Sequence, residues 1–430
     1  MKKAFLLLII LLVATSMVFS AGTKESAGAA TASASGTVRW AYWGGEARIT
    51  RSAQAVLLFE SANPGIKVNM EPSGGSGDHF VKVDTQLAAV SGPDIIQMGG
   101  NIDDYIKRGA LLPLNGYVGT ILNTSVIDPG AIEAGSRDGN LYGVTTGANM
   151  PALVYNKSLL ERSGAPLPKV SMTYDEFRAY LLLIRDKLPK GVYPMMDIGI
   201  LSSNSTPFGY WTGYNGTPLY KTAENRTYVT PADATKYLEL FKDYRDNGLI
   251  PPADVAAAYA ETNADSSAIV AGKVAIGFLW TNQIGGWQAT MTDEIDFIEF
   301  PGAAEKNSLW QTQSQYYTVN KDAKNPELAV RFINFLVNSP EAAIVLGSDR
   351  GSSASSTARA AGSASAADQK ILSYMQVAGP HTSPEGDHVP NDTELNSTLY
   401  LIYQRVAFGQ ITPADGGQQI YDLLIRLISK

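Results

Sequence analysis

Strand-like and helix-like segments alternate along this chain from Thr37 onward, and this alternation constrains the fold more than any other feature of the sequence. The first five predicted elements are a strand, a helix, a strand, a helix and a strand, at 38–43, 49–61, 66–70, 80–90 and 93–98. Val56, Leu57 and Phe59 are expected among the buried side chains of the first helix. Alternation of this kind is typical of α/β proteins with mostly parallel sheets, which is the fold class we predict.

The alternation continues through the second half of the chain. Strands are predicted at 152–155, 274–280 and 316–320, and a helix at 326–337. Three further helices begin with a threonine followed three residues later by an acid, the pattern of a capping box, at Thr173/Glu176, Thr230/Asp233 and Thr412/Asp415. The dipeptide Asp138-Gly139 predicts a tight hairpin.

The N-terminus has the parts of a secretory signal. Lys2 and Lys3 precede an apolar run over 4–13, and small residues lie near Ser20, after which we expect cleavage. The alternative is an uncleaved membrane anchor. Residues 21–36 are small and polar and are predicted to be a disordered tether. With no cysteine to carry a lipid, the sequence predicts a soluble periplasmic protein.

Charge and composition exclude several classes of function. The 34 Lys and Arg residues are outnumbered by 41 Asp and Glu residues, which disfavours nucleic acid as a partner. The absence of cysteine removes disulfides, thiolate zinc sites and iron–sulfur clusters. The three histidines lack metal-ligand spacing, and the glycine-rich loop at 72–79 lacks the fingerprint of a nucleotide loop, so no metal or cofactor is predicted.

Aromatic residues at the ends of predicted elements are the most informative cluster. Trp43 ends the first strand before two glycines, on the face opposite to Trp40 and Tyr42. Trp211 lies in a segment predicted to be a glycine-rich loop, and Trp280 ends a strand just before Asn282 and Gln283. Each of these rings could equally be core. Together, rings beside amides suit sugars, whose C–H faces stack on aromatics while their hydroxyls need donors and acceptors.

Signals for catalysis are weak. Two suitably spaced carboxylates suffice for glycoside hydrolysis, so an exported glycan hydrolase stays open as an alternative. Asp103 and Asp104 are the obvious pair, although adjacent acids at a helix start more often interact with the helix dipole. Asp78 is read either as a helix cap or as a carboxylate that accepts two sugar hydroxyls.

Several segments resemble a known family. The sequence at 40–48, 59–68 and 92–97 is similar to the opening of extracellular solute-binding proteins (family 1) of carbohydrate ABC transporters. The resemblance continues, in the expected order, at 139–144, 153–157, 280–283, 326–336 and 346–351. It implies a two-lobed periplasmic binding protein fold (type II), in which hinge-linked, discontinuous lobes enclose a central ligand cleft.

The resemblance also implies a domain division and a set of binding residues. The N-terminal lobe would hold 37–146 plus 311–365, and the C-terminal lobe 147–310 plus 366–430. The cleft residues it implies are Trp43, Arg48, Asp78, Gln97, Asn101, Asn149, Trp211, Trp280, Asn282, Gln283 and Arg350. Related proteins usually carry a tryptophan near Ser76, where this chain has only glycine and serine, so stacking on that side is expected to be missing.

The function implied is that of a non-catalytic receptor. It would bind a sugar, with an oligosaccharide as the expected ligand, close by a hinge motion and deliver the ligand to the permease subunits in the inner membrane as a monomer. An acidic sugar such as an oligogalacturonide stays open as an alternative, because Arg48 or Arg350 could pair with a uronate carboxylate. A receptor for peptides, polyamines or metal complexes on the same frame is a weaker alternative.

Overall fold

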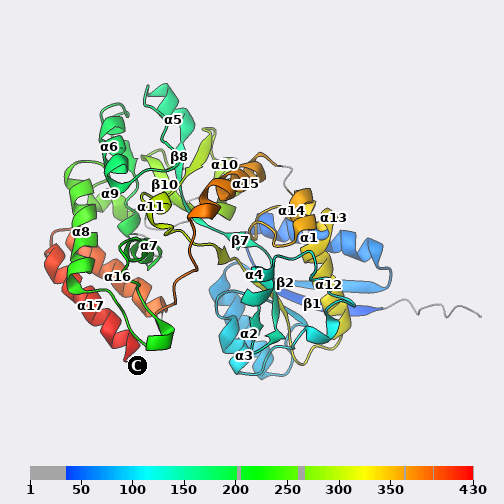
Figure 1. Ribbon diagram of the computed structural model, residues 1–430. Coiled ribbons are helices and arrows are strands. Elements are labelled where there is room, and N and C mark those ends of the chain that lie inside the picture. The colour runs from blue at the N-terminus through cyan, green and yellow to red at the C-terminus, as the bar shows by residue number, and fades with distance from the viewer. Residues whose placement is uncertain (1–34, 201–204, 260–266, 363–364, 391, 430) are drawn as a thin grey trace, which may run out of the picture.

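The computed structural model describes residues 35–200, 205–259, 267–362, 365–390 and 392–429, and the chain forms two lobes joined by a narrow middle segment (Figure 1). The two-lobed α/β architecture predicted from the sequence is therefore confirmed. The predicted signal peptide and residues 21–34 of the predicted tether lie outside the described residues. Gly36, which we placed in the tether, already belongs to the first strand.

Lobe one is built on a five-stranded sheet in the order β2-β1-β3-β13-β6. Its strands are β1 (Gly36–Trp43), β2 (Ile66–Ser73), β3 (Ile95–Met98), β6 (Gly143–Thr145) and β13 (Tyr316–Val319), and the hairpin β4 (Ser136–Arg137) and β5 (Asn140–Leu141) lies beside them. Its helices are α1 (Glu46–Ala62), α2 (Ser76–Ala88), α3 (Ile102–Lys107), α4 (Pro129–Ala134), α12 (Pro326–Asn338), α13 (Pro340–Leu346) and α14 (Ser356–Gly362), with the short η1 (Asn115–Tyr117).

Lobe two is built on a four-stranded sheet in the order β11-β8-β10-β9. Its strands are β8 (Pro151–Asn156), β9 (Tyr193–Met195), β10 (Val274–Trp280) and β11 (Ile295–Ile298). Its helices are α5 (Lys157–Arg162), α6 (Tyr174–Arg185), α7 (Ser205–Tyr214), α8 (Pro231–Asp246), α9 (Ala253–Ala257), α10 (Ile284–Thr290), α11 (Ala303–Lys306), α15 (Ala366–Ala378), α16 (Asp392–Ala407) and α17 (Pro413–Ile428). Short 3-10 turns are η2 (Ile198–Ile200), η3 (Thr222–Glu224), η5 (Thr281–Gln283) and η6 (Gly379–His381).

Both sheets are mixed, so the expectation of mostly parallel sheets was wrong. β1 is parallel to β2 and β3, but β13 enters lobe one antiparallel to both β3 and β6. In lobe two β8 is antiparallel to β10 and β11, and β9 is parallel to β10. The cause is that the chain crosses between the lobes, and a strand that returns from the other lobe need not follow a right-handed crossover helix.

Three chain segments meet where the lobes join. β7 (Ala148–Asn149) pairs antiparallel with β12 (Thr312–Gln313) on one side and bridges to Ser352 on the other. A Cβ on Gly147 would lie 2.5 Å from the Ser352 carbonyl oxygen, so only glycine permits this approach. The crossing is therefore a tightly packed three-chain ribbon. The exact lobe limits given above stay a prediction.

Local sequence signals fix the ends of several helices. All three predicted capping boxes are present, with backbone N–H to threonine Oγ1 distances of 3.1 Å in α6, 3.2 Å in α8 and 3.1 Å in α17. Each cap of this kind contributes about 1 kcal/mol. α17 packs on α8 through Gly417, where a Cβ would lie 2.2 Å from the Thr235 hydroxyl oxygen. The C-terminal helix is thus held close to the body of lobe two.

Each lobe has its own hydrophobic core. In lobe one the Trp40 ring packs edge-on against Tyr317 and Phe332, with ring centroids 5.8 and 5.3 Å apart. Val56 and Phe59 of α1 join this core as predicted, but Leu57 is 67% exposed, so its predicted burial was wrong. The buried stripe of α1 therefore runs along 52, 55, 56 and 59, with helical spacing of three and four residues.

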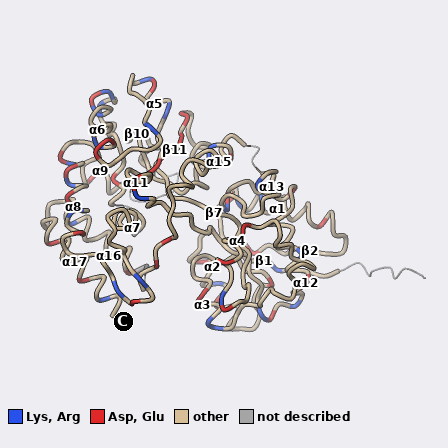
Figure 2. Tube along the Cα trace, viewed as in Figure 1, with Lys and Arg blue, Asp and Glu red and all other residues tan. Residues whose placement is uncertain are grey.

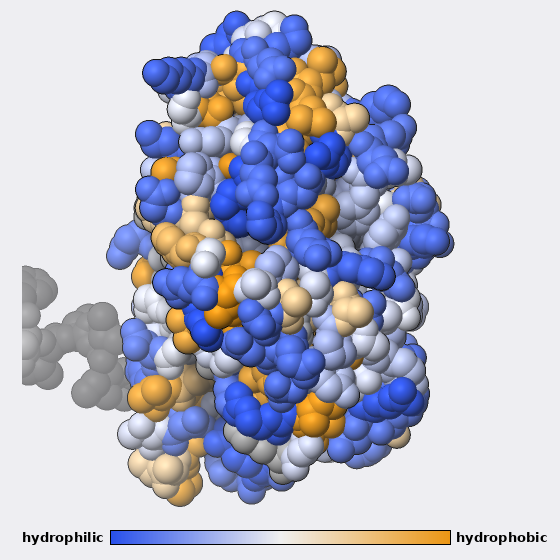
Figure 3. Space-filling model, turned by 90° about the vertical axis from the view of Figure 1, so that its left-hand side faces the viewer, coloured by the Kyte–Doolittle hydropathy of each residue, from blue (hydrophilic) through white to orange (hydrophobic). Residues whose placement is uncertain are grey.

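The surface carries charges of both signs over both lobes (Figure 2). On the face of lobe two in Figure 3, hydrophobic residues form separate patches among hydrophilic ones. Among the described residues, no single helix is long and apolar enough to cross a membrane. The pair α12 and α13 passes such a test together, but it is bent by 70° and its apolar residues are packed in lobe one's core.

Candidate functional site

The strand ends of lobe one point toward lobe two, and Trp43 is the last residue of β1. Its ring is only partly buried and contacts the rings of His79 and Phe80, with centroids 5.1 and 5.6 Å away. His79 is buried and its Nε2 lies 2.9 Å from the Gln97 carbonyl oxygen. Burial lowers the pKa of the His79 imidazole, although this hydrogen bond opposes the shift. A neutral imidazole therefore supports one side of the Trp43 ring.

Two predicted polar residues lie near this ring. Asn101 accepts a hydrogen bond from the Gly99 backbone N–H at 3.3 Å, and a Cβ placed on Gly99 would lie 3.8 Å from Cη2 of the Trp43 ring. Asp78 is exposed in the first turn of α2. The N-cap of that helix is Gly75, so the reading of Asp78 as a helix cap was wrong.

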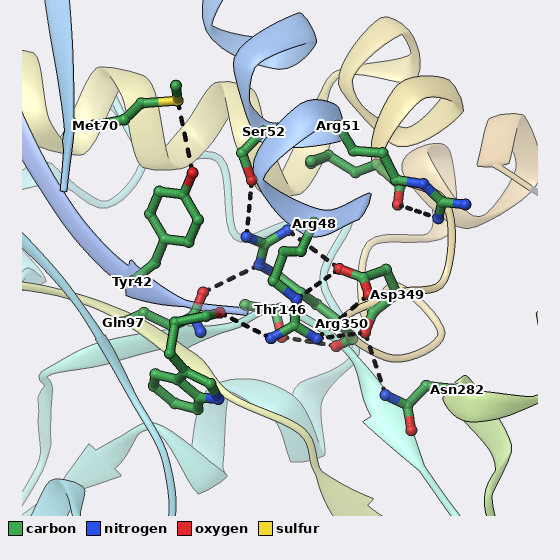
Figure 4. Close-up of polar contacts among 12 residues, drawn as sticks. Tyr42, Arg48, Arg51, Ser52, Met70, Gln97, Thr146, Asn282, Asp349 and Arg350 are labelled. Carbon is green, nitrogen blue, oxygen red and sulfur yellow. Dashed lines mark hydrogen bonds and ion pairs between the residues drawn. The ribbon is translucent and has the colours of Figure 1, made fainter. Parts of the chain in front are cut away.

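A network around Asp349 joins the two lobes (Figure 4). Arg48 Nε donates to Asp349 Oδ2 at 2.7 Å, and its Nη2 donates to the Asp349 carbonyl oxygen at 2.9 Å. Asn282 Nδ2, from lobe two, donates to the same carbonyl oxygen at 3.2 Å. Arg48 Nη1 also donates to the Trp43 carbonyl oxygen at 3.1 Å. All three nitrogen atoms of the Arg48 guanidinium are thus engaged within the protein.

A second arginine lies beneath this network, inside lobe one. Arg350 is only 5% exposed; its Nε donates to Gln97 Oε1 at 3.0 Å and its Nη2 to Ser52 Oγ at 2.9 Å. Its guanidinium carbon is 5.7 Å from the Trp40 ring centroid and 5.5 Å from that of Tyr42. Burial lowers the pKa of Arg350. Its Nη1 has no hydrogen-bond partner among the described residues.

The structure also locates a small pocket of about 60 Å³ between the lobes, on the side of α13, α14 and α15. Arg350 is the one predicted binding residue in its lining. Leu336 and Leu346 of lobe one and Ile371 and Leu372 of lobe two make much of the wall apolar. Arg350 therefore reaches this side, while the Trp43 ring contacts His79 and Phe80 of α2.

Of the six tryptophans, three are core and three keep part of their surface exposed. Trp211 was predicted in a loop facing the cleft; it lies in α7, is 8% exposed and packs on Tyr237 in the core of lobe two. The three that stay partly exposed are Trp43, Trp280 and Trp310. Trp310 was missed from the sequence, although its position one residue before the predicted lobe boundary at 311 was a usable signal.

The remaining predicted residues lie at the edge of lobe two. Gln283 Oε1 accepts the Trp280 backbone N–H at 2.8 Å, so this amide orders the end of β10. Asn149 of β7 is buried, and its Oδ1 has no hydrogen-bond partner in the part of the chain that the structure describes. The crossing strand β7 therefore brings Asn149 to the junction beside the end of β10. The backbone N–H of Thr281, just after β10, donates to the Met150 carbonyl oxygen at 3.0 Å and joins the two segments.

One of the two acids considered for catalysis is engaged in an ion pair within the protein. Asp103 Oδ1 lies 2.7 Å from Arg137 Nε in an ion pair within lobe one. Among the described residues, no group of three or more His, Cys, Asp or Glu side chains is arranged to hold a metal ion. The junction instead presents aromatic rings, amides and two arginines, a set suited to binding.

The family follows from a match that covers residues 28–343, more than half of the chain, to the model of the bacterial extracellular solute-binding proteins. The chain belongs to this family. Its resemblance to extracellular solute-binding proteins, inferred from the quoted motifs, is confirmed.

Individual relatives agree with the family. A protein of Brucella abortus described as a binding protein is 30% identical over 123 residues, which is 28% of this chain and only 29% of that relative. A family 1 extracellular solute-binding protein from Alicyclobacillus acidocaldarius is 27% identical, with a TM-score of 0.73 over 92% of this chain and 99% of that one. A periplasmic oligogalacturonide binding protein from Yersinia enterocolitica, with digalacturonic acid, is 22% identical, with a TM-score of 0.77 over 91% and 99%.

Proposed function

We propose that this solute-binding protein is the sugar receptor of an ABC importer, acting in the periplasm after removal of the signal peptide. One observation carries the proposal: the three partly exposed tryptophans stand beside strand ends, Trp43 at the end of β1, Trp280 at the end of β10 and Trp310 two residues before β12 of the crossing. Rings and neutral amides recognise the C–H faces and hydroxyls of sugars. The oligogalacturonide bound by the Yersinia protein is also a sugar.

The mechanism we propose is closure of the lobes on the ligand. The three-chain crossing at β7 acts as the hinge, and groups from both lobes enclose the sugar. The Asn282 hydrogen bond to the Asp349 carbonyl then holds the lobes in the closed arrangement. The closed form is presented to the permease subunits, and the receptor itself is a monomer that performs no chemistry.

Isothermal titration calorimetry with a panel of neutral mono- to tetrasaccharides and digalacturonate tests the proposal. For whichever sugar binds the wild type, Trp43→Ala and Trp280→Ala should each reduce the binding free energy by about 1–3 kcal/mol, as loss of a buried aromatic anchor does. Phe408→Ala is the matched control, because Phe408 is an aromatic residue of lobe two, 47% exposed, at the end of α16. Absence of binding to every member by folded protein would refute the proposal.

An acidic sugar is the second candidate, and the observation that favours it is Nη1 of Arg350, which makes no hydrogen bond among the described residues and has only a 3.6 Å ion pair with Asp349 Oδ2. Arg48 is a poor partner for a uronate, since it would have to leave Asp349. A preference for digalacturonate that disappears at high salt would support this candidate. Incubation with labelled oligosaccharides separates either receptor from a hydrolase, because a receptor returns them intact.

A further inference from the structure

The crossing strands leave a polar atom without a partner on the face toward which Trp310 lies. Oδ1 of Asn149 is buried and has no hydrogen-bond partner among the described residues. Asn149 is directly opposite Thr312 in the antiparallel β7–β12 pair, so their side chains share one face. Trp310 precedes Thr312 by two residues, which places it on that face as well. Unsatisfied buried polar groups in a native protein call for an explanation, and a ligand is one.

A loop of lobe two brings a carboxylate to the same place. The segment after η6 is fixed to the crossing chain by backbone hydrogen bonds: Leu309 N–H donates to the His381 carbonyl at 3.2 Å and Ser383 N–H donates to the Leu309 carbonyl at 2.8 Å. Two residues further on, Glu385 lies beside Thr312 and Trp310. Residues far apart in the sequence therefore form one cluster of an indole, a hydroxyl, an amide and a carboxyl group.

The Glu385 carboxyl group is partly exposed and partly enclosed by protein. Its side chain is 32% exposed, yet burial raises the pKa of its carboxyl group, with the Thr312 hydroxyl, the His388 charge and the Trp310 N–H opposing the rise. Solvent thus reaches a carboxyl group that protein surrounds on most sides.

The charges that face Glu385 come from both lobes. His388 of the same loop has its Nε2 3.7 Å from Glu385 Oε1. From lobe one, Asp103 and Arg137 lie near the Tyr316 hydroxyl, as Glu385 does. Burial raises the pKa of Tyr316 to about 12; the charges of Glu385 and Asp103 add to the rise and that of Arg137 opposes it. Because Asp103 and Arg137 pair with each other at 2.7 Å, they add little net charge. The net charge of the cluster at neutral pH is therefore set by Glu385.

We propose that Glu385, Trp310, Asn149 and Thr312 form a subsite that selects an uncharged sugar residue. The indole stacks on the sugar ring, the Glu385 carboxylate accepts hydrogen bonds from two vicinal hydroxyls, and Asn149 Oδ1 accepts a third. A uronate at this position would place its carboxylate against that of Glu385, so the same group rejects acidic sugars. The inference rests on the proposed sugar-binding function and deepens it.

Calorimetry on Glu385→Gln with neutral di- to tetrasaccharides and digalacturonate tests this inference. Glutamine keeps the shape and loses the charge, so affinity for the neutral ligand should fall by about 10- to 100-fold at pH 7, as expected for loss of hydrogen bonds to a charged group. Affinity for digalacturonate should rise relative to the wild type. Asp387→Asn is the matched control: it removes a charge from the same loop, but that carboxylate accepts the Thr222 backbone N–H at 2.7 Å.

A pH series adds a second readout. As the pH is lowered and Glu385 becomes protonated, the affinity of the wild type for a neutral sugar should fall. This pH dependence should be absent from Glu385→Gln. Unchanged ligand preference in Glu385→Gln, or a change equal to that of Asp387→Asn, would overturn the inference and leave the proposed function standing. Failure of the folded wild-type protein to bind any sugar would overturn both.

Discussion

The buried ion pair of lobe two allows one prediction to be worked out in detail. Asp197 has a fully buried side chain that pairs with Arg245, accepts the Tyr403 hydroxyl at 2.5 Å and accepts the Gly199 backbone N–H at 3.2 Å. The Arg245 side chain is only 13% exposed. Asp197→Ala therefore leaves a buried guanidinium and a buried hydroxyl without their acceptor.

Removing one partner of a buried ion pair costs about 3–5 kcal/mol, because the remaining charge stays desolvated. For a lobe of this size each kcal/mol lowers the melting temperature by about 2–4 °C, so we expect a decrease of about 6–20 °C. Asp246→Asn is the control. It breaks an i,i+4 pair with Lys242 whose side chains are 53% and 58% exposed, worth about 0.3–0.5 kcal/mol.

Thermal unfolding followed by circular dichroism measures both variants. The double variant Asp197→Leu/Arg245→Met should recover most of the loss, since an apolar pair carries no desolvation penalty. A melting temperature for Asp197→Ala within 2 °C of the control would refute the reasoning. Because Tyr403 is 206 residues from Asp197 in sequence, the same experiment tests whether the C-terminal segment is part of lobe two's core.

Three further predictions follow from the crossing and from buried titratable groups. Gly147→Ala places a Cβ 2.5 Å from the Ser352 carbonyl oxygen and should separate the crossing strands, seen as a larger radius of gyration by small-angle X-ray scattering and weaker sugar binding; Gly45→Ala, which meets nothing within 4 Å, should change neither. Burial lowers the pKa of His79, so the unfolded state binds more protons and stability is lost as pH falls below about 6.5; urea midpoints at pH 5 and 7 should differ less in His79→Gln. Burial alone would raise the pKa of Glu71, but its hydrogen bonds, led by that from Arg39, lower it overall, so its contribution is present above about pH 4.3 and lost in acid; urea midpoints at pH 3 and 6 should differ less in Glu71→Gln.

Sequence patterns predicted the structure correctly where the interactions join residues close together in the sequence. The capping boxes at Thr173, Thr230 and Thr412 involve residues three apart, so nothing elsewhere in the chain can displace them. Trp211 shows the opposite case. The glycines around it predicted a loop, but burial of Phe208 and Trp211 against lobe two's core outweighs the helix penalty of glycine, about 1 kcal/mol each.

The site was harder to predict than the fold because it depends on contacts between distant segments. Asn282 was a reasonable candidate, yet only the structure shows that it donates to the Asp349 carbonyl. Glu385 lies in a loop rich in proline and glycine that carries no motif. The backbone pairing of Leu309 with residues 381–383 brings Glu385 close to Trp310, and no sequence pattern predicts this pairing.

The position of β13 has a consequence for when this protein can fold. β13 lies between β3 and β6, with Tyr316 opposite both Met98 and Thr145, so it closes a gap in a sheet whose other strands come from the first 145 residues. Lobe one cannot complete its sheet until residue 319 has left the ribosome, and loop closure over such a distance is slow. In the export that we propose, this delay would keep the chain unfolded while it is threaded through a membrane channel, so that folding would follow on the far side.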